Sequence, residues 1–571
     1  MEIPQFESPQ LVIDDCRRLT GPSLVWDKIG AILDVVIKGR DMDEVLECWY
    51  RHINDLLIAL DWPTPCLAHR RYENGFSLLL AAPLDQLYSA TLVLETAWYF
   101  CCCELLNKSP QNGEALTQAV IKSMQDEQLP ALIELQQAAS NHDVDCLVDD
   151  EVVAVGHGEG SLQWSLDDLP ISDQVDWASV HDLPIALVTG TNGKSTSVRV
   201  LDEIARAAGY VSGVTSTDFV RVGDDVLDRG DYSGPGGARL LLRDKRLQIA
   251  FLEVARGGIL RRGLPIRRAK AALITNVGAD HLGQYGINTL EALIEVKFVI
   301  RQALPDDAVI VLNADDEGIV DYMSRHPRQN VCWFSLDKNH RRIQYQLENR
   351  GRCCFAEVGQ LFYFDGNSES LICSVEDIPM TMHGAALHNV RNALGAIGTS
   401  IAMGISIDHI RHGLNQFRSD ASDNPGRLNI FELKNGARVI VDFAHNAHSV
   451  GAVVDTVKRM PASRKWILCS SAGDRSDADI RAIAQGLSAM QPDQIVIVEI
   501  DHYLRGRAMG EVSSIMKQAC LDSGLNARQI HLADSPLAGV SLILPQMLAQ
   551  DLGLFLVLDQ REEVIELLKQ F

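Results

Sequence analysis

The sequence predicts an α/β protein in which a mostly helical N-terminal region precedes two domains built on parallel sheets. Helical spacing of apolar residues dominates the first part of the chain, strand and helix patterns alternate after Leu183, and a second alternation begins near Asn424. Short apolar runs of this kind are typical of strands that helices cover on both faces. We therefore predict three domains, comprising residues 1–182, 183–421 and 422–571.

The N-terminal region contains two helical patterns and one hairpin pattern. Residues 30–60, GAILDVVIKGRDMDEVLECWYRHINDLLIAL, repeat apolar residues at helical spacing and end near DWPTP, where two prolines stop the helix. The Cys101–Cys103 run lies in a second helical pattern, which favours buried thiols over a metal or redox site. Residues 149–166, DDEVVAVGHGEGSLQWSL, predict a hairpin; GHGEG resembles a phosphate loop, but no helix pattern follows it.

The net charge of the chain limits its partners. The formal net charge is −24 and the isoelectric point is about 5.1, so the field of the whole protein repels a nucleic-acid backbone. The most apolar stretch, LVLETAWYFCCCELL, is interrupted by Glu95 and Glu104 and is shorter than the ~20 residues of a membrane span. The N-terminal MEIPQFESPQ lacks the pattern of a secretory signal. We expect a cytoplasmic protein that binds neither nucleic acid nor membrane and keeps its thirteen cysteines as free thiols.

The two α/β domains are predicted from eight apolar runs. The runs of the central domain are PIALVTG, QIAFLEVA, AALITNV and AVIVLNADD, and those of the C-terminal domain are ARVIVDFAH, RKWILCSSAG, DQIVIVEI and LFLVLD. The segment SDASDNPG is polar and breaks both periodicities. We interpret it as a hinge near Ser422 that moves when the domains close.

A glycine-rich turn leads from the strand at Pro184 into a helix, which is the arrangement that binds phosphate. In this turn, Lys194 would neutralise the β- and γ-phosphates and Ser195 would coordinate Mg²⁺. The spacing is G-x-x-G-K-S-T, because Val188 stands where the general phosphate-loop motif has its first glycine. The predicted nucleotide-binding residues of this loop are Gly190, Thr191, Asn192, Gly193, Lys194, Ser195 and Thr196.

The loop GTNGKST resembles the ATP-binding loop of the Mur ligase family, whose members join amino acids to carboxylates at the expense of ATP. The resemblance covers about residues 183–571. Its further motifs, in the order expected of the family, are LEVARGGILRRGL, TNVGADHLGQYGINTLEALIEVK, LNADD, HNVRNALGAIG, NPGRLNIF, VIVDFAHN, AGDRSDADIRAIA and LRGRAMGE. The closest likeness is to the Mur-ligase half of cyanophycin synthetases. RLTGPSLVWD faintly resembles the start of such a synthetase, and we expect no ATP-grasp module, since none fits before Pro184.

The resemblance implies two divalent metal sites. Glu253 would hold Mg²⁺ between the β- and γ-phosphates, although a salt bridge to Arg256 is the structural alternative. His281 would bind a second magnesium, supported by Asn276 and Asp280; an isolated histidine is more often structural. Lys297 stands where several Mur ligases carry a carbamylated lysine that supports the second metal; its alternative is a surface lysine on a helix.

Further residues are assigned to the nucleotide by the resemblance. Asn389 would bind the adenine, accompanied by His388 and by Asn392, which could instead cap or pack the following helix. Arg427 would reach the ATP phosphates when the domains close. Asp442, with His445 and Asn446, should face the cleft. Ala447 replaces the proline that the family often has after this motif, so the local loop geometry departs from the family pattern.

The amine substrate is assigned to loops at strand ends of the last domain. Asp474 and Arg475 follow a strand, where open α/β sheets bind ligands. The segment DHYLRGR lies where related ligases recognise the incoming amino acid. Arg505 or Arg507 would therefore bind its α-carboxylate in a bidentate pair, and the alternative for either is a solvated surface arginine.

Together these assignments predict an ATP-dependent amide ligase with ATP and Mg²⁺ as cofactors. The catalytic residues would be Lys194, Glu253, His281 and Arg427. A carboxylate would attack the γ-phosphate to give an acyl phosphate, and an amine would then displace phosphate. One alternative is a non-catalytic ATP-binding regulatory or scaffolding protein, and another is a simple P-loop kinase or NTPase, which the second α/β domain disfavours.

The substrates are predicted only as a class: a small-molecule or peptide carboxylate and an amino-acid amine. The likeness to cyanophycin synthetase implies addition of arginine to an aspartate side chain on a growing peptide. Without an ATP-grasp module, three options remain open: joining preformed pieces, acting beside a separate ATP-grasp enzyme, or modifying another carboxylate. Acceptor binding by the N-terminal region and a homo-oligomeric state also remain open.

Overall fold

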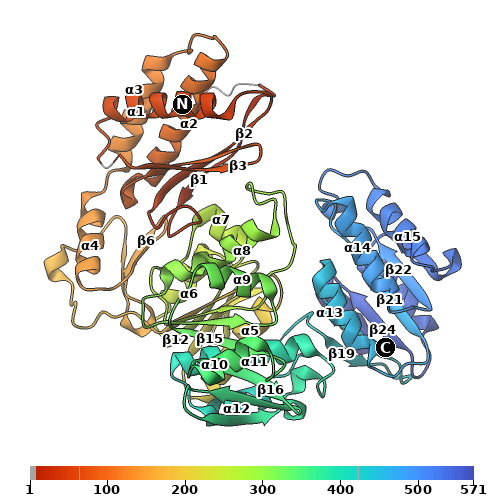
Figure 1. The fold of residues 1–571 in the computed structure, drawn as a ribbon. Coiled ribbons are helices and arrows are strands. Elements are labelled where there is room, and N and C mark those ends of the chain that lie inside the picture. The colour runs from red at the N-terminus through yellow and green to blue at the C-terminus, as the bar shows by residue number, and fades with distance from the viewer. Residues whose placement is uncertain (1–7, 64, 421–423) are drawn as a thin grey trace.

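The computed structural model describes residues 8–63, 65–420 and 424–571. Figure 1 shows an N-terminal region (red to orange), a central domain (yellow to teal) and a C-terminal domain (blue). The predicted hinge at Ser422, and with it the boundary between residues 421 and 422, lies outside the described residues. Among the described residues, no helix combines the length and the apolar character needed to cross a bilayer.

The N-terminal region combines helices with two antiparallel sheets. The described part of the first sheet has the strand order β1-β2-β4-β3, and that of the second has the order β5-β6-β7. Helices α1 and α2 pack together, and α2 also contacts β1 and β2. The elements are β1 (Leu11–Leu19), β2 (Gly30–Ile37), α1 (Met42–Ala59), β3 (Leu67–Tyr72), β4 (Gly75–Ala81), α2 (Leu87–Leu105), α3 (Gly113–Glu127), α4 (Pro130–Asn141), β5 (Cys146–Val148), β6 (Val152–Val155) and β7 (Leu162–Ser165).

The helical prediction for residues 30–60 is wrong for its first part. Residues 30–37 form β2, which pairs with β1 on one side and β4 on the other. Nearly all of its residues are buried, so it has no polar face to distinguish a strand from a buried helix by periodicity alone. The helix begins only after Asp41, whose side chain accepts hydrogen bonds from two backbone N–H groups as an N-cap. Its end at Ala59, just before DWPTP, agrees with the prediction.

The predicted hairpin and the predicted burial of the cysteine run agree with the structure. Strands β6 and β7 form the predicted antiparallel hairpin, and GHGEG turns through a short 3₁₀ helix at Gly158–Gly160 rather than into an α-helix. The Cys101–Cys103 run is buried in α2. Burial raises the pKa of Cys102 to about 12, so that thiol remains protonated and unreactive at neutral pH.

One histidine of the GHGEG turn joins two carboxylates in the interior. The Nε2 atom of His157 lies 3.5 Å from Oδ2 of Asp145, and its Nδ1 atom lies 3.3 Å from Oδ1 of Asp182. Burial alone would lower the pKa of His157, but the two carboxylates outweigh burial and raise it. The imidazolium therefore ties the β5–β7 sheet to the segment that enters the central domain.

Replacing His157 with glutamine is expected to lower the free energy of unfolding by about 2 kcal/mol near pH 6.5. A histidine pKa that is raised on folding stabilises the protein below the ordinary value of 6.5, and this stabilisation is lost as the pH rises through the folded-state value. Urea unfolding of both proteins should therefore show a difference that shrinks as the pH rises above 6.5 and through the folded-state pKa. A difference that does not change with pH would contradict the charged pairing.

The central domain is built on one large sheet. Its described strands run in the order β11-β10-β9-β12-β8-β13-β14-β15-β16-β17-β18, with parallel pairing from β9 through β16 and antiparallel strands at both edges. The elements are β8 (Ile185–Thr189), α5 (Lys194–Ala207), β9 (Ser212–Thr215), β10 (Phe219–Val222), β11 (Asp225–Arg229), α6 (Pro235–Leu242), β12 (Ile249–Glu253), α7 (Arg256–Arg262), β13 (Ala271–Ile274), α8 (Leu290–Phe298), β14 (Val309–Asn313), α9 (Glu317–Arg325), β15 (Val331–Ser335), α10 (Arg341–Glu348), β16 (Arg352–Glu357), β17 (Gln360–Phe364), β18 (Glu369–Ser374), α11 (Leu387–Met403) and α12 (Ile407–Gln416).

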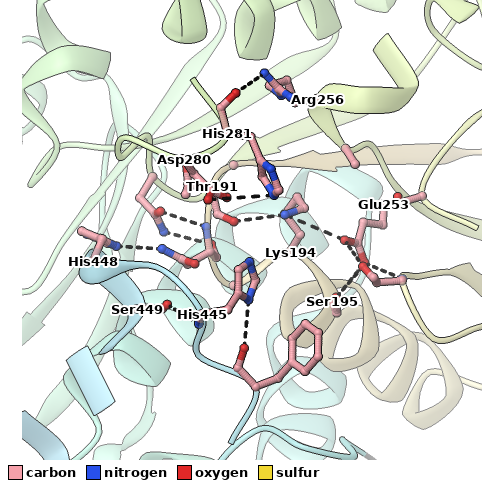
Figure 2. Close-up of a pocket in the computed structure, with 18 of the residues that line it drawn as sticks. Thr191, Lys194, Ser195, Glu253, Arg256, Asp280, His281, His445, His448 and Ser449 are labelled. Atoms are coloured by element: carbon pink, nitrogen blue, oxygen red, sulfur yellow. Dashed lines mark hydrogen bonds and ion pairs between the residues drawn. The ribbon is translucent and has the colours of Figure 1, made fainter. Parts of the chain in front are cut away.

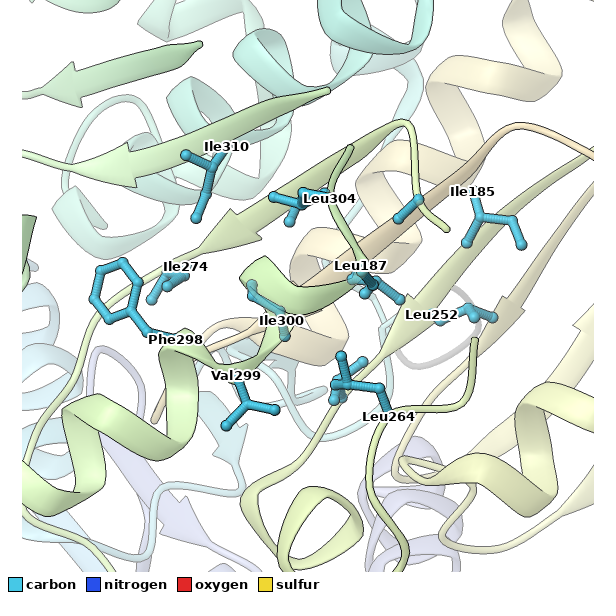
Figure 3. Close-up of a cluster of buried hydrophobic side chains, with 14 of the residues drawn as sticks. Ile185, Leu187, Leu252, Leu264, Ile274, Phe298, Val299, Ile300, Leu304 and Ile310 are labelled. Carbon is cyan, nitrogen blue, oxygen red and sulfur yellow. The ribbon is translucent and has the colours of Figure 1, made fainter. Parts of the chain in front are cut away.

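Helices cover both faces of this sheet, as its apolar strands predict. Ile185 and Leu187 of β8 point into the core that α8 and the following 3₁₀ turn close, which Figure 3 shows together with Ile274 and Phe298. The alternate residues of β8 pack on the other face, against α5 and α11. A strand buried on both faces is apolar along most of its length, and β8, which is fully buried, is apolar at every position but the last.

The C-terminal domain is a smaller α/β sheet. Its described strands have the order β19-β20-β24-β21-β22-β23, in which β19 is antiparallel and the others are parallel. All eight predicted strand runs of the two domains are therefore strands. The elements are β19 (Asn429–Glu432), β20 (Arg438–Asp442), α13 (Ala447–Lys458), β21 (Lys465–Cys469), α14 (Asp477–Ser488), β22 (Gln494–Val498), α15 (Glu511–Asp522), β23 (Ile530–Ala533), α16 (Pro536–Ile543), β24 (Leu552–Leu556) and α17 (Arg561–Gln570).

The N-terminal sheet packs on two segments of the central domain. Arg17 donates through Nη2 to the carbonyl of Leu260 in α7 at 2.9 Å. Arg70 donates through Nη2 to the carbonyl of Tyr285 at 2.6 Å, in the loop that follows β13. Both segments reach the cleft described below, so the N-terminal region holds one wall of that cleft in place.

Candidate functional site

A cleft of about 1410 Å³ lies between the central and C-terminal domains. The residues that follow β8, β12 and β13 line one side of it, and those that follow β20, together with the start of α13, line the other. Figure 2 shows side chains from both domains converging on this space. Its position beyond the carboxyl ends of parallel strands is the usual ligand site of open α/β sheets.

The phosphate loop has the backbone form that its glycines predict. Gly190 has φ of 143° and Gly193 has φ of 86°, and a Cβ atom at either position would lie within 2.4 Å of a neighbouring side-chain oxygen. Helix α5 begins at Lys194 without a side-chain cap. The first backbone N–H groups of the helix therefore lack acceptors and remain available to an anion.

A second loop, at residues 275–278, holds the phosphate loop in place through hydrogen bonds to Asn192. Asn276 accepts through Oδ1 from the N–H of Asn192 at 3.1 Å and donates through Nδ2 to the carbonyl of Asn192 at 2.9 Å. Thr275 donates to the same carbonyl at 2.6 Å. Asn276, which we predicted to support a metal, therefore positions the phosphate loop.

Three oxygen-bearing side chains meet beside the phosphate loop. Glu253 is 2% exposed and accepts from Ser195 Oγ at 2.8 Å and from Thr217 Oγ1 at 2.8 Å. Lys194 Nζ lies 3.9 Å from Glu253 Oε1 and donates to the carbonyl of Thr191 at 3.1 Å. Hydroxyl and carboxylate oxygens are the ligands that Mg²⁺ prefers. The structural alternative for Glu253, a salt bridge to Arg256, is wrong, because Arg256 donates elsewhere.

Asp280, His281 and His445 form a second cluster, with one ligand atom from each within 4.8 Å of the others. Burial lowers the pKa of both histidines, that of His445 to about 4, so their rings are neutral at neutral pH. Nδ1 of His445 lies 2.9 Å from the carbonyl of Phe443, which can only accept. The Nδ1 atom therefore carries the proton, and Nε2 is left as an electron-pair donor for a metal.

Polar contacts join the two domains across this cleft. Arg475 donates through Nη1 to Oδ1 of Asp280 at 3.1 Å. Asn192 of the phosphate loop lies 2.8 Å from Nδ1 of His448, and Nδ2 of Asn446 donates to Oδ1 of Asn192 at 3.2 Å. The start of α13 is thereby held directly against the phosphate loop.

Lys297 is buried, so the surface alternative for this residue is wrong. It is 3% exposed in α8 and donates through Nζ to the carbonyl of Gly190 at 2.9 Å. Burial, together with the positive charge of Lys194, lowers its pKa well below the usual value. An uncharged amine is the form that can take up carbon dioxide, and carbamylation of Lys297 stays a prediction.

The residues predicted to bind the nucleotide also line the cleft. Asn389 donates through Nδ2 to the carbonyl of Met380 at 2.8 Å and accepts from Asn392 at 3.1 Å. These hydrogen bonds fix the orientation of both asparagine side chains. Asp442 accepts from the N–H of Leu428 at 2.8 Å and thereby holds the turn that carries Arg427. The role of each in binding ATP stays a prediction.

The two arginines predicted to bind the amine have different surroundings. Arg505 lines the cleft and donates through Nη1 to Oδ2 of Asp474 at 2.5 Å. Arg507 donates to the carbonyls of Gly473 and Arg475, each at 2.8 Å, and lies outside the cleft lining. Arg507 therefore shapes the loop, whereas Arg505 is placed to meet a ligand.

The structure brings most of the predicted site residues into one cleft. Asp474 and Arg507 lie behind its lining. Sequence reasoning missed Thr217, whose hydroxyl and N–H both donate to Glu253; its only signal was a polar segment, TSTD, after a four-residue strand. The predicted residues that line the cleft are Gly190, Thr191, Asn192, Gly193, Lys194, Ser195, Thr196, Glu253, Asn276, Asp280, His281, Lys297, His388, Asn389, Asn392, Arg427, Asp442, His445, Arg475 and Arg505.

The two α/β domains and the cleft between them define a class of protein in which a phosphate loop on one domain faces an opposing domain. Family comparison agrees with that class. Residues 188–400 match the Mur ligase middle domain, and residues 426–556 match the Mur ligase glutamate ligase domain. Over these two domains, which together span more than half of its length, the chain belongs to the Mur ligase family.

Individual relatives are similar to parts of the chain. A cyanophycin synthetase of Geminocystis herdmanii is 37% identical over 62% of this chain and 40% of its own length. A UDP-N-acetylmuramoyl-L-alanyl-D-glutamate–2,6-diaminopimelate ligase of Bacillus velezensis is 24% identical over 53% of this chain and 60% of its own. Among solved structures, FolC of E. coli in complex with DHPP and ADP has a TM-score of 0.49 at 18% identity, covering 68% of this chain and 89% of that one. The chain spans 38–44% of the length of the cyanophycin synthetases that it matches.

Proposed function

We propose that this chain is an ATP-dependent amide ligase that activates a carboxylate as an acyl phosphate and couples it to an amine. The observation that carries the proposal is the pairing of two sites in one cleft. An uncapped phosphate loop with a Ser195–Thr217–Glu253 oxygen cluster stands on the central domain, and arginines of the C-terminal domain face it. A ligase needs both halves, because the acyl phosphate formed at one must meet the amine held at the other.

The residues present fit ATP and Mg²⁺. The uncapped start of α5 and the side chain of Lys194 suit a triphosphate, and the oxygens of Ser195, Thr217 and Glu253 suit a hard divalent cation. The neutral His281 and His445, with Asp280, fit a second divalent ion. Bound there, such ions would neutralise the charge that two anionic reactants bring together.

In the proposed reaction the chain positions reactants and balances charge. An oxygen of the substrate carboxylate attacks the γ-phosphorus, the bond to the β–γ bridging oxygen breaks, and ADP leaves. Lys194 and Arg427 would stabilise the negative charge on the transferring group. The amine then attacks the acyl carbon, loses a proton, and expels phosphate. The Asn192–His448 and Arg475–Asp280 contacts support a closed arrangement that keeps water from the acyl phosphate.

A non-catalytic scaffold is the alternative that the chemistry disfavours. A protein that only binds ATP has no need of a second cluster of neutral histidines 4.8 Å or less from a carboxylate. It also has no need of an arginine-bearing loop on the far side of the cleft. A kinase would need the phosphate loop and the oxygen cluster, but not an amine site.

The test is a phosphate-release assay with carboxylates and amines supplied singly and in pairs, with products identified by mass spectrometry. Release that requires both partners, together with a new amide mass, supports the ligase. Binding of ATP without turnover would support a scaffold, and a stable phosphorylated product would support a kinase.

Replacing Arg505 with alanine is expected to raise the KM for the amine about tenfold, since a charged hydrogen bond is lost, and to leave the KM for ATP nearly unchanged. Arg528→Ala removes the same charge from an exposed position outside the cleft and is the matched control. Arg507→Ala should act through the loop it braces and change kcat as well. An amine KM that Arg505→Ala leaves unaltered would place the amine pocket elsewhere.

A further inference from the structure

Three arginines of α7 line the cleft on the side that the N-terminal region contacts. Arg256 is fully engaged, because it donates to the carbonyl of His281 and to Gln284 Oε1, each at 2.6 Å. Arg261 makes one contact at 3.1 Å with the hydroxyl of Tyr285, and Arg262 makes one at 3.3 Å with a backbone carbonyl. Within the described chain, neither Arg261 nor Arg262 has a carboxylate oxygen within 4.0 Å.

Three carboxylates of the N-terminal region pair with other arginines: Asp15 with Arg17, Asp149 with Arg243, and Asp150 with Arg18. Burial, followed by the charges of Arg18 and Arg17, lowers the pKa of Arg262. Arg18 and Arg17 therefore repel Arg262, and Asp15 acts against this repulsion without forming an ion pair with Arg262.

The composition makes this cluster informative. The chain has 76 acidic and 52 basic residues, so acidic partners are abundant. Arginines that line a cleft without an ion pair in such a chain indicate that an external anion completes the site. Open space lies beside these arginines. A Cβ atom at Gly236 or Gly257 would meet nothing within 4 Å, which leaves room for a ligand backbone.

We propose that Arg261 and Arg262 bind a second anionic group of the carboxylate substrate, which is therefore a polycarboxylate rather than a simple monoacid. This inference rests on the proposed ligase function, because it assumes that the reacting carboxylate lies near His281 and the phosphate loop. Arg261 follows Arg256, which contacts the His281 loop, by five positions in the helix, a rise of about 7.5 Å along the axis. The second anionic group would therefore bind farther along α7 than the reacting one.

The test is calorimetric binding of two probes to the full chain in the presence of ADP and Mg²⁺. N-acetyl-Glu-Glu carries three carboxylates, and N-acetyl-Glu-Gln-amide carries one. The wild-type protein should bind the triacid at least about tenfold more tightly. The double variant Arg261→Gln/Arg262→Gln should lose most of this preference while retaining its affinity for ADP, which shows that it is folded. Arg246→Gln, which removes an exposed arginine outside the cleft, should retain the preference.

The inference is overturned if the wild-type protein binds the two probes equally, if it binds neither, or if the double variant keeps the preference. The readout is binding, so it separates this inference from the ligase proposal. Amide formation from some carboxylate and amine, without the binding preference, would leave the ligase standing and remove the subsite. If the double variant lost the binding preference but no pair of carboxylate and amine gave an amide, the subsite would stand and the ligase proposal would fall.

Discussion

Replacing Lys194 with alanine is expected to lower kcat about 10³-fold, because the charge that stabilises the transferring phosphoryl group is lost. The side chain makes no core contact on which folding depends: Nζ donates to the carbonyl of Thr191 and lies 3.9 Å from Glu253. Thermal stability should therefore stay close to that of the wild-type protein. Phosphate release and the unfolding midpoint, measured on the same preparation, check both parts.

Lys245→Ala is the matched control, since Lys245 is exposed and lies outside the cleft. It should have wild-type turnover. If Lys194→Ala retained more than about a tenth of the wild-type kcat, the phosphate loop would not be the site of phosphoryl transfer. Removal of a single donor at such a site lowers kcat by at least about 10²-fold.

Replacing Glu253 with glutamine is expected to lower turnover by about 10² to 10³-fold and to raise the Mg²⁺ concentration needed for half-maximal activity. Glutamine keeps the size of the side chain but removes the charge that a divalent cation requires. Its amide nitrogen would also face donors, since Ser195, Thr217 Oγ1 and the N–H of Thr217 all point at the carboxylate.

A magnesium titration distinguishes this effect from misfolding. Activity of Glu253→Gln that partly recovers at high Mg²⁺ supports a weakened metal site. Glu317→Gln, a change of the same kind at the start of α9 in the cleft lining but remote from the oxygen cluster, is the control and should keep the wild-type Mg²⁺ dependence. An unaltered Mg²⁺ dependence in Glu253→Gln would contradict the assignment of Glu253 as a ligand.

The sequence predicted those elements that a local motif marks. Strand β8 and helix α5 follow from an apolar run, two glycines and a helical pattern, and the structure places them as expected. Strand β2 was missed, because its run is almost entirely buried, has no polar face from which to tell its period, and lacks a phosphate-loop motif such as the one that follows β8. The Asp41 cap marks the true start of α1 and was the available signal.

The features of the site that the sequence did not predict are those that depend on contacts between distant segments. Thr217 meets Glu253 only because β9 and β12 are neighbours in the sheet. The Arg475–Asp280 pair joins two domains and has no local pattern. Whether Lys297 lay on a surface or in the interior likewise depended on how α8 packs beneath the phosphate loop.

The measurement that tests the central proposal most directly is isotope transfer. The carboxylate substrate is labelled with oxygen-18, and the phosphate released during amide formation is analysed by mass spectrometry. An acyl phosphate intermediate predicts that one labelled oxygen passes from the acid to the phosphate in each turnover. Phosphate that carries no label while the amide is formed would contradict activation of the carboxylate by phosphoryl transfer.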